Sequence, residues 1–364
     1  MWRTFGQATT ISWLSRSIRE GEGHHAYLLL GPEHVGKRTL ATDIACALNC
    51  TSAESPCGEC EACRRILDSK HADVIAATLN EPIEASEDSQ PDEEDTHPGR
   101  NIRLRQVRRL QHMASLPPFE GRTKVLIIEN SDRMTPEAAN SILKSLEEPP
   151  QHVVWLLLAE DESHLLETIV SRCQRIDVLP APVPDLERYL TESYGLEPER
   201  ASLIARLSRG RTGWAILAST DESVLASRAS RVETIIQLVY MTHTARFDLA
   251  REIESQYRRD PRGVLETLEL WTTWWRDLLV IKGGCSDGIV NVDYVNDLNE
   301  QAGRLSLEQI REFIGKLSEA TENLDFNMIP RLVFYSLVYS IPRIEKPTGE
   351  GEVPLVVLQD DSET

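Results

Sequence analysis

The chain has 364 residues, a formal net charge of −19 and 41% hydrophobic residues. This length predicts two or three domains, and the composition is typical of a protein with a well-formed buried core. The large negative charge argues against a protein whose whole surface binds nucleic acid. No stretch approaches the roughly 20 apolar residues that cross a bilayer, and the first residues lack a signal-peptide pattern. We therefore expect a cytoplasmic protein without a membrane partner.

The acidic residues are concentrated in two short segments. Residues 80–100 contain eight acids, and residues 346–364 contain five. The first segment holds too little apolar surface to offset the entropy lost on ordering. We expect a disordered acidic insertion at 80–100 and a disordered acidic tail at 346–364.

Short apolar runs alternate with amphipathic stretches in the first half of the chain. Runs at 26–30, 124–128 and 153–158 predict buried strands, and weaker signals at 73–77 and 175–178 predict two more. Stretches between them follow helical spacing. This alternation predicts an α/β domain with a parallel sheet over residues 1–178.

After a proline-rich linker at 179–184 the strand pattern disappears. Amphipathic helical spacing continues in its place. We expect a small helical domain at 181–220 and a larger all-helical domain at 221–345.

The segment GPEHVGKR follows the first predicted strand and opens a helix, which is the setting of a phosphate-binding P-loop. Gly31, Gly36 and Lys37 have the required spacing, so backbone N–H groups and the lysine amine can cradle phosphate. A Ser or Thr hydroxyl that holds Mg²⁺ should follow, but Arg38 stands there. Thr39 comes one position late, rotated about 100° around the helix. We expect Mg²⁺-dependent hydrolysis to be impaired.

Two further positions of this predicted site are altered. An ATPase needs two acids after the third strand, one for the metal and one to polarise water, whereas this chain has Glu129 and Asn130. After the fourth strand Glu160 places a carboxylate where it would repel phosphate. We predict no intrinsic ATPase activity. The loop either binds ATP without hydrolysing it or serves as a structural turn.

Four cysteines lie within fourteen residues, with the spacing Cys50-x6-Cys57-x2-Cys60-x2-Cys63. Zn²⁺ takes four soft ligands in a tetrahedron, and closely spaced cysteines supply them. A redox motif would need only one pair. We predict a structural zinc knuckle at 50–63, with Cys46 as a core residue of the preceding helix.

These features together resemble the bacterial clamp-loader AAA+ subunits. The segments HAYLLLGPEHVGK, the cysteine knuckle, VLIIENSDRMTPEAANSILKSLEEPP and Ser171-Arg172-Cys173 follow one another in the order of that family. The resemblance implies an AAA+ P-loop module with a zinc-knuckle insertion at 1–178, a helical lid at 181–220 and an all-α collar domain at 221–345. It also implies a subunit of the DNA polymerase III holoenzyme.

Within that family the altered loop resembles the delta-prime type more than the ATP-hydrolysing gamma/tau type. The segment around Gly213 also lacks the arginine that an active subunit would carry there. The resemblance implies gamma/tau and delta subunits, a sliding clamp and primed DNA as partners. Two alternatives are kept: an active gamma/tau-type ATPase, and a degenerate AAA+ zinc scaffold outside replication.

The Ser171-Arg172-Cys173 motif acquires a role only through this resemblance. In the family the arginine projects into the ATP site of the neighbouring subunit. A fixed guanidinium neutralises charge on the transferring phosphoryl group. The resemblance therefore implies that Arg172 is an arginine finger acting in trans. Without it, an ordinary surface arginine would be the simpler interpretation.

Overall fold

The computed structural model describes residues 1–79, 101–285, 288–325 and 328–344. The acidic insertion and the acidic tail predicted from the sequence lie outside these residues. The chain divides into two compact units, here called the N-terminal unit and the helical unit. The N-terminal unit comprises Met1–Tyr189 and Gly210–Ala215. The helical unit comprises Leu190–Arg209 and Ile216–Thr364.

A five-stranded sheet forms the centre of the N-terminal unit. All recorded strand pairs are parallel, and the strand order is β2-β3-β4-β1-β5. Strands β1, β3 and β4 are buried along their whole length, which explains their continuous apolar sequences. The strands are β1 (Ala26–Leu30), β2 (Val74–Ala77), β3 (Lys124–Ile128), β4 (Val153–Ala159) and β5 (Gln174–Asp177).

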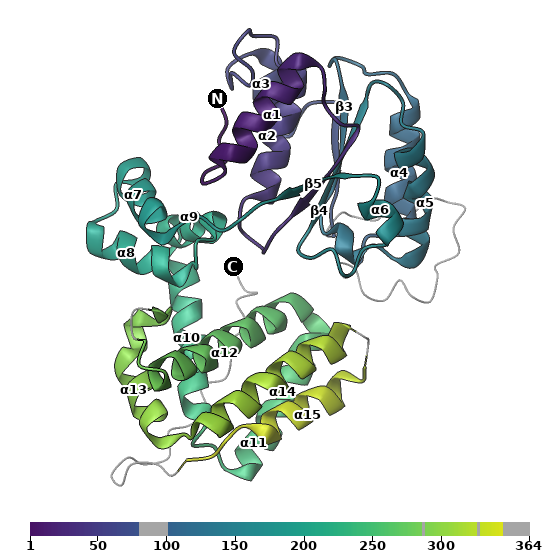
Figure 1. Cartoon of the computed structure of the whole chain (residues 1–364). Coiled ribbons are helices and arrows are strands. Elements are labelled where there is room, and N and C mark those ends of the chain that lie inside the picture. The colour runs from purple at the N-terminus through teal and green to yellow at the C-terminus, as the bar shows by residue number, and fades with distance from the viewer. Residues whose placement is uncertain (80–100, 286–287, 326–327, 345–364) are drawn as a thin grey trace. The chain divides into compact units, whose positions relative to one another are not determined.

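Helices cover both faces of this sheet (Figure 1). On one face Tyr27 and Leu29 pack in a core with residues of α1, α2 and α3. On the other face Leu28 and Leu30 pack in a core with residues of α4, α5 and α6. The helices of this unit are α1 (Ala8–Glu20), α2 (Lys37–Asn49), α3 (Glu61–Leu67), α4 (Leu104–Ser115), the 3₁₀ turn η2 (Ser131–Arg133), α5 (Pro136–Glu147) and α6 (Glu167–Val170).

The five predicted strands appear with boundaries shifted by at most one residue. The Thr135 hydroxyl caps α5 by accepting from the Ala138 N–H, and Pro136 occupies the first turn. The predicted parallel α/β fold class is confirmed. Strand β1 lies between β4 and β5, so the loop after it leaves the carboxyl edge of the sheet where the strand order reverses. Ligands of such sheets bind at this place.

Beyond β5 the described residues form helices and connecting loops. They are α7 (Val183–Tyr194), α8 (Pro198–Leu207), α9 (Thr212–Thr220), α10 (Glu222–Leu238), α11 (His243–Arg259), α12 (Pro261–Lys282), the 3₁₀ turn η4 (Val292–Tyr294), α13 (Val295–Arg304), α14 (Leu307–Asp325) and α15 (Pro330–Ser340).

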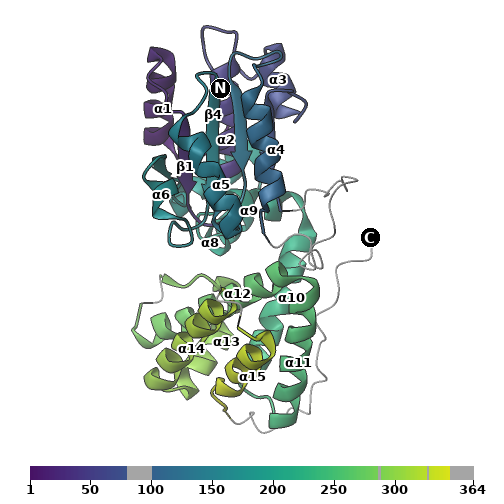
Figure 2. The ribbon, with the colours of Figure 1, turned by 90° about the vertical axis from the view of Figure 1, so that its right-hand side faces the viewer.

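Helix α12 is the central helix of the helical unit. It packs against α10, α11, α13 and α14, while α11 lies beside α15 (Figure 2). Trp271, Trp274 and Trp275 are almost fully buried at its centre, as their apolar helical spacing predicts. Within the described part of the chain, no helix has the length and hydropathy needed to span a membrane.

Candidate functional site

The phosphate-binding loop connects β1 to α2. Gly31 has a φ of 154°, and a Cβ there would lie 2.2 Å from the Val178 carbonyl oxygen. Gly36, which precedes α2, has a φ of 108° in the region that favours glycine. Both glycines are therefore required by the backbone path. The loop has the strand–turn–helix geometry that the sequence predicts.

The Lys37 amine is directed at its own loop. Nζ donates to the carbonyl oxygen of Gly31 at 2.5 Å and to that of Pro32 at 3.0 Å. Burial lowers the pKa of Lys37, and the nearby carboxyl groups of Glu160, Asp132 and Glu33 act in the opposite direction. A phosphate bound in the loop would have to replace these carbonyl contacts.

Arg38 and Glu129 form an ion pair, with 2.7 Å between an Arg38 guanidinium nitrogen and a Glu129 carboxylate oxygen. The side chain of Arg38 is 63% exposed and that of Glu129 is 18% exposed. Burial raises the pKa of Glu129, and the Arg38 charge opposes that shift. The two positions that would hold a metal in an ATPase are thus joined to each other. Thr39, the next residue of α2, is half-buried.

A group of carboxyl groups lies close to the Lys37 amine. Burial, together with Glu33 and Asp132, raises the pKa of Glu160 to about 7. Burial also raises the pKa of Asp132, whose carboxylate accepts from the Glu160 N–H at 3.4 Å. Sequence reasoning identified Glu160 but missed Asp132 and Glu33. Asp132 lies in η2, two residues after Asn130, and its proximity depends on that turn.

The start of α9 contacts the phosphate loop directly. The Gly213 N–H donates to the His34 carbonyl oxygen at 2.7 Å, and a Cβ at Gly213 would lie 2.8 Å from that oxygen. His34 has a φ of 59°, so the loop is left-handed at this point. An active subunit of the resembled family would have an arginine near this position. Here a glycine backbone makes the contact.

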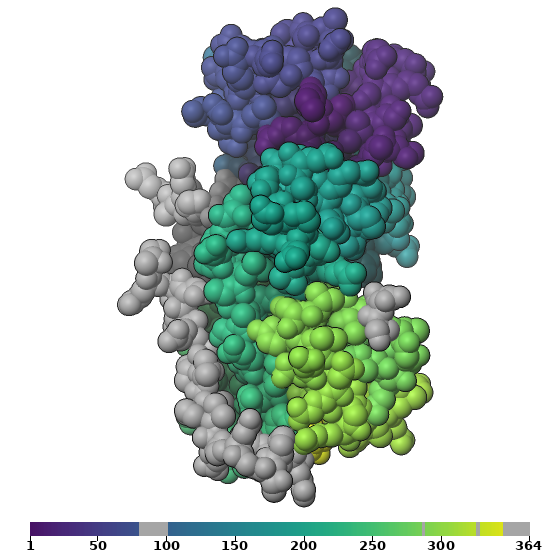
Figure 3. Space-filling model, turned by 90° about the vertical axis from the view of Figure 1, so that its left-hand side faces the viewer, coloured from purple at the N-terminus to yellow at the C-terminus, as the bar shows by residue number. Residues whose placement is uncertain are grey.

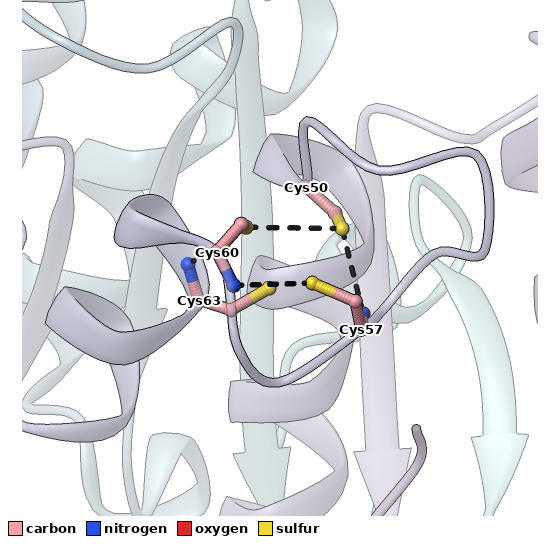
Figure 4. Close-up of side chains that lie close together, drawn as sticks. All are labelled: Cys50, Cys57, Cys60 and Cys63. Atoms are coloured by element: carbon pink, nitrogen blue, oxygen red, sulfur yellow. Dashed lines mark hydrogen bonds between the residues drawn. The ribbon is translucent and has the colours of Figure 1, made fainter.

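The four predicted zinc ligands meet in one cluster (Figure 4). Their sulfur atoms all lie within 4.8 Å of one another, which suits a tetrahedral metal site. Cys50 follows the last residue of α2, Cys60 caps α3, and Cys63 lies in its first turn. The cluster can hold a metal ion.

Backbone N–H groups point at the sulfur atoms of the cluster. The N–H of Cys60 donates to the Cys57 sulfur at 3.3 Å, and the N–H of Cys57 donates to that of Cys50 at 3.4 Å. Such donors stabilise thiolates. They lower the pKa of Cys57. For Cys60 burial raises the pKa, but donors from Thr51 and Cys63 outweigh it and bring the value to about 6.

The rest of the knuckle is more buried. Cys63 is fully buried, and this burial raises the pKa of its thiol. Cys46 lies in the core under the knuckle, where burial raises its pKa to about 11, so the prediction of a core residue is confirmed. Figure 3 shows the surface of the α3 segment, in blue-violet, on the same face as α1, in purple. Helix α2 spans about 20 Å between the phosphate loop and the knuckle, so the two sites are distinct.

Arg172 lies at the surface, just after α6. Its guanidinium donates to the Thr168 carbonyl oxygen at 2.8 Å and to a Glu147 carboxylate oxygen at 2.6 Å. The side chain is 33% exposed. The adjacent Cys173 packs against the core, and burial raises its pKa to about 12. The geometry therefore offers a guanidinium at the surface, held by Thr168 and Glu147 and followed by a half-buried cysteine.

The sheet, the phosphate loop and the helices that follow them define an AAA+-type P-loop protein. Residues 6–182 match the model of a family described as DNA polymerase III, delta subunit. Residues 6–182 belong to this family, and over most of its length the chain is similar to both the delta' and the tau subunit of Bacillus subtilis.

The curated relatives agree with this assignment. The chain is 27% identical to the DNA polymerase III subunit delta' of Bacillus subtilis, a match over 88% of this chain and 92% of the relative. It is 38% identical to that of Pseudomonas aeruginosa, over 49% of this chain and 50% of the relative. It is 34% identical to the tau subunit of Escherichia coli, over 63% of this chain but only 33% of that relative.

The solved structures include a DNA polymerase III gamma subunit-related protein of Thermotoga maritima. It is 18% identical, with a TM-score of 0.39 over 90% of this chain and 97% of that chain. The clamp loader delta protein of Bacillus subtilis is 14% identical, with a TM-score of 0.33 over 91% of this chain and 99% of that one.

Proposed function

We propose that this chain is a non-hydrolysing clamp-loader subunit of DNA replication, of the delta-prime type. The observation that carries the proposal is the Arg38–Glu129 ion pair, which occupies the two positions where a hydrolysing subunit holds Mg²⁺. Asn130, in place of the second acid, cannot act as a base. The similarity to delta' and tau proteins supports the coarser part of the proposal, a clamp-loader subunit.

The subunit would contribute Arg172 to the ATP site of a neighbouring gamma/tau subunit. In the isolated chain this guanidinium is held by Glu147, which is 49% exposed. An exposed ion pair stabilises by at most about 1 kcal/mol. The arginine can therefore leave Glu147 at little cost when a neighbour presents phosphate.

The remaining parts of the proposal concern the assembly. The segments 181–220 and 221–345 would act as lid and collar and would join gamma/tau and delta subunits. The assembly would open a sliding clamp and place it on primed DNA in the cytoplasm. Zinc would occupy the four-cysteine cluster and hold the segment between α2 and α3 in place.

The arginine-finger prediction is tested by reconstitution with the partner subunits. Arg172→Ala should lower the DNA-stimulated ATPase rate by at least about a thousandfold at the neighbouring subunit's ATP site to which Arg172 would contribute. The complex should still assemble normally, as measured on a sizing column. Arg175→Ala is the matched control, because Arg175 is also exposed and paired with carboxylates. An unchanged ATPase rate with Arg172→Ala would contradict the role in trans.

The rival proposal of an active gamma/tau-type ATPase is tested with the isolated chain, the clamp and primed DNA. We expect no ATP turnover, because Arg38 replaces the hydroxyl that would hold Mg²⁺ and Asn130 cannot act as a base. Turnover that Lys37→Ala abolishes would show that the chain hydrolyses ATP itself. For the scaffold alternative, capture of the chain from its native cell without any polymerase III subunit would favour a role outside replication.

A further inference from the structure

The phosphate loop retains the groups that bind phosphate but lacks those that bind Mg²⁺, and the proposed function does not account for this combination. Lys37 and both loop glycines are in place, so the groups that cradle phosphate are present. The residues do not fit the divalent cation that normally accompanies a nucleotide in such a loop. Mg²⁺ needs oxygen ligands in octahedral geometry, and position 38 offers a guanidinium, which has donors but no lone pair.

The guanidinium of Arg38 also engages the nearest potential metal ligand. Its nitrogen lies 2.7 Å from a carboxylate oxygen of Glu129, the residue that follows β3. A dication at this place would have to displace the Arg38 guanidinium from Glu129, and it would then lie close to the Lys37 amine. Coulomb repulsion between them grows as the site loses water. Arg38 therefore supplies the positive charge that a metal would otherwise bring.

We propose that this loop binds a nucleoside diphosphate free of metal, with the Arg38 guanidinium in the metal's place. Three positive elements would face the phosphates: the Lys37 amine, the Arg38 guanidinium and the N–H groups at the start of α2, a helix of 13 residues. Guanidinium groups bind phosphate oxygens through two parallel N–H donors. The binding does not depend on the partner subunits.

The carboxyl groups near Lys37 limit how many phosphates the loop accepts. In a P-loop the lysine reaches the outer phosphates, while the backbone holds the inner ones. The Gly31 N–H donates to the Ala159 carbonyl oxygen at 3.2 Å, which places the next residue, Glu160, beside the loop, and an Asp132 carboxylate oxygen accepts from the Glu160 N–H at 3.4 Å. We place these carboxyl groups on the side of the outer phosphates, because Lys37, whose amine they act on, reaches those phosphates. A third phosphate adds negative charge on that side. The site therefore prefers a diphosphate to a triphosphate.

The test is calorimetric titration of the isolated chain with ADP and with ATP, each in EDTA and in excess Mg²⁺. We expect ADP to bind in EDTA, Mg²⁺ not to strengthen it, and ATP to bind about tenfold more weakly. No ADP binding at millimolar concentration would overturn the proposal. So would tighter binding with Mg²⁺, or ATP binding more tightly than ADP.

Variants at position 38 separate the guanidinium from general charge. Arg38→Thr restores a hydroxyl and frees Glu129, so Mg²⁺ should now strengthen ADP binding by about tenfold. Arg38→Lys keeps the cation and should stay independent of Mg²⁺. Arg19→Thr, near the end of α1 and away from the loop, controls for the loss of one charge. Melting curves show whether each variant is folded. Metal independence retained in folded Arg38→Thr would contradict the role of Arg38.

Discussion

Glu160 shows how one side chain can work against both phosphate binding and stability. It follows β4 at the carboxyl edge of the sheet, and Glu33 and Asp132 are the charges that act on it most strongly. Burial and these two neighbours favour its protonated form. The same arrangement would resist a bound triphosphate. Neither metal binding nor ATP hydrolysis accounts for a carboxyl group at the position of Glu160.

Replacing Glu160 by glutamine should stabilise the protein in a pH-dependent way. The ordinary pKa of 4.5 is raised to about 7 in the folded state, so stability is lost as the pH rises through this interval. The amide of the E160Q variant does not ionise, and the variant escapes that loss. We expect E160Q to gain about 3 kcal/mol relative to the parent at pH 8 and almost nothing at pH 4.

Urea denaturation at the two pH values measures this difference. Glu148→Gln, at an exposed position after α5, is the matched control and should leave the stability difference between the two pH values unchanged. An equal effect of E160Q at both pH values would show that the carboxyl group titrates normally in the folded chain.

At the scale of elements, the cysteine knuckle connects α2 to α3. Helix α3 has only seven residues, too few to be stable alone in water. Its capping residue is Cys60, so a metal bound by the cysteines would couple its binding to the formation of this helix. The short helix is thus expected to depend on the ion.

Metal analysis should find about one zinc per chain, because four thiolates satisfy one tetrahedral ion. Replacing both Cys57 and Cys60 by Ser should remove the zinc and lower the melting temperature of the N-terminal unit. Cys285→Ser is the control, since Cys285 is exposed and lies outside the cluster. Full zinc content in the double variant would mean that the metal binds elsewhere.

The elements that the sequence predicts well are those set by local patterns. Strand β3 appears with its predicted bounds, and α5 begins at Thr135 and Pro136, two residue types that favour a helix start. Helix α3 was not predicted, although Cys63, Ile66 and Leu67 have helical spacing, because seven residues are too few for a helical pattern to stand out. The Arg38–Glu129 pair could not be predicted either, because it joins the start of α2 to the end of β3. Such contacts depend on strand order, which no local pattern encodes.

At the scale of the whole molecule, backbone contacts decide which segments belong together. The sequence groups residues 181–220 as one helical segment. In the structure Gly210–Ala215 belongs to the N-terminal unit, because the Gly213 N–H bonds to the phosphate loop and the Ala181 N–H bonds to the Gly210 carbonyl oxygen. The sequence shows that position 213 is a glycine, but it does not show which backbone segment will approach that glycine closely.

The helical unit has a core of its own, and a change there should leave the metal site intact. Trp275 is fully buried, and its ring lies 4.5 Å from that of Phe313 between ring centres. The core that contains it shares no residue with the two cores of the N-terminal unit. Trp275→Ala should destabilise the helical unit by about 3–5 kcal/mol.

Calorimetry and metal analysis of Trp275→Ala would test this separation. We expect the transition of the helical unit to move to lower temperature while the chain retains about one zinc. Trp155→Ala, which removes an equally buried ring from β4, should lower the transition of the N-terminal unit instead. A single transition that both variants lower by the same amount would show that the two units unfold together, because their stabilities would then be coupled despite the separate cores.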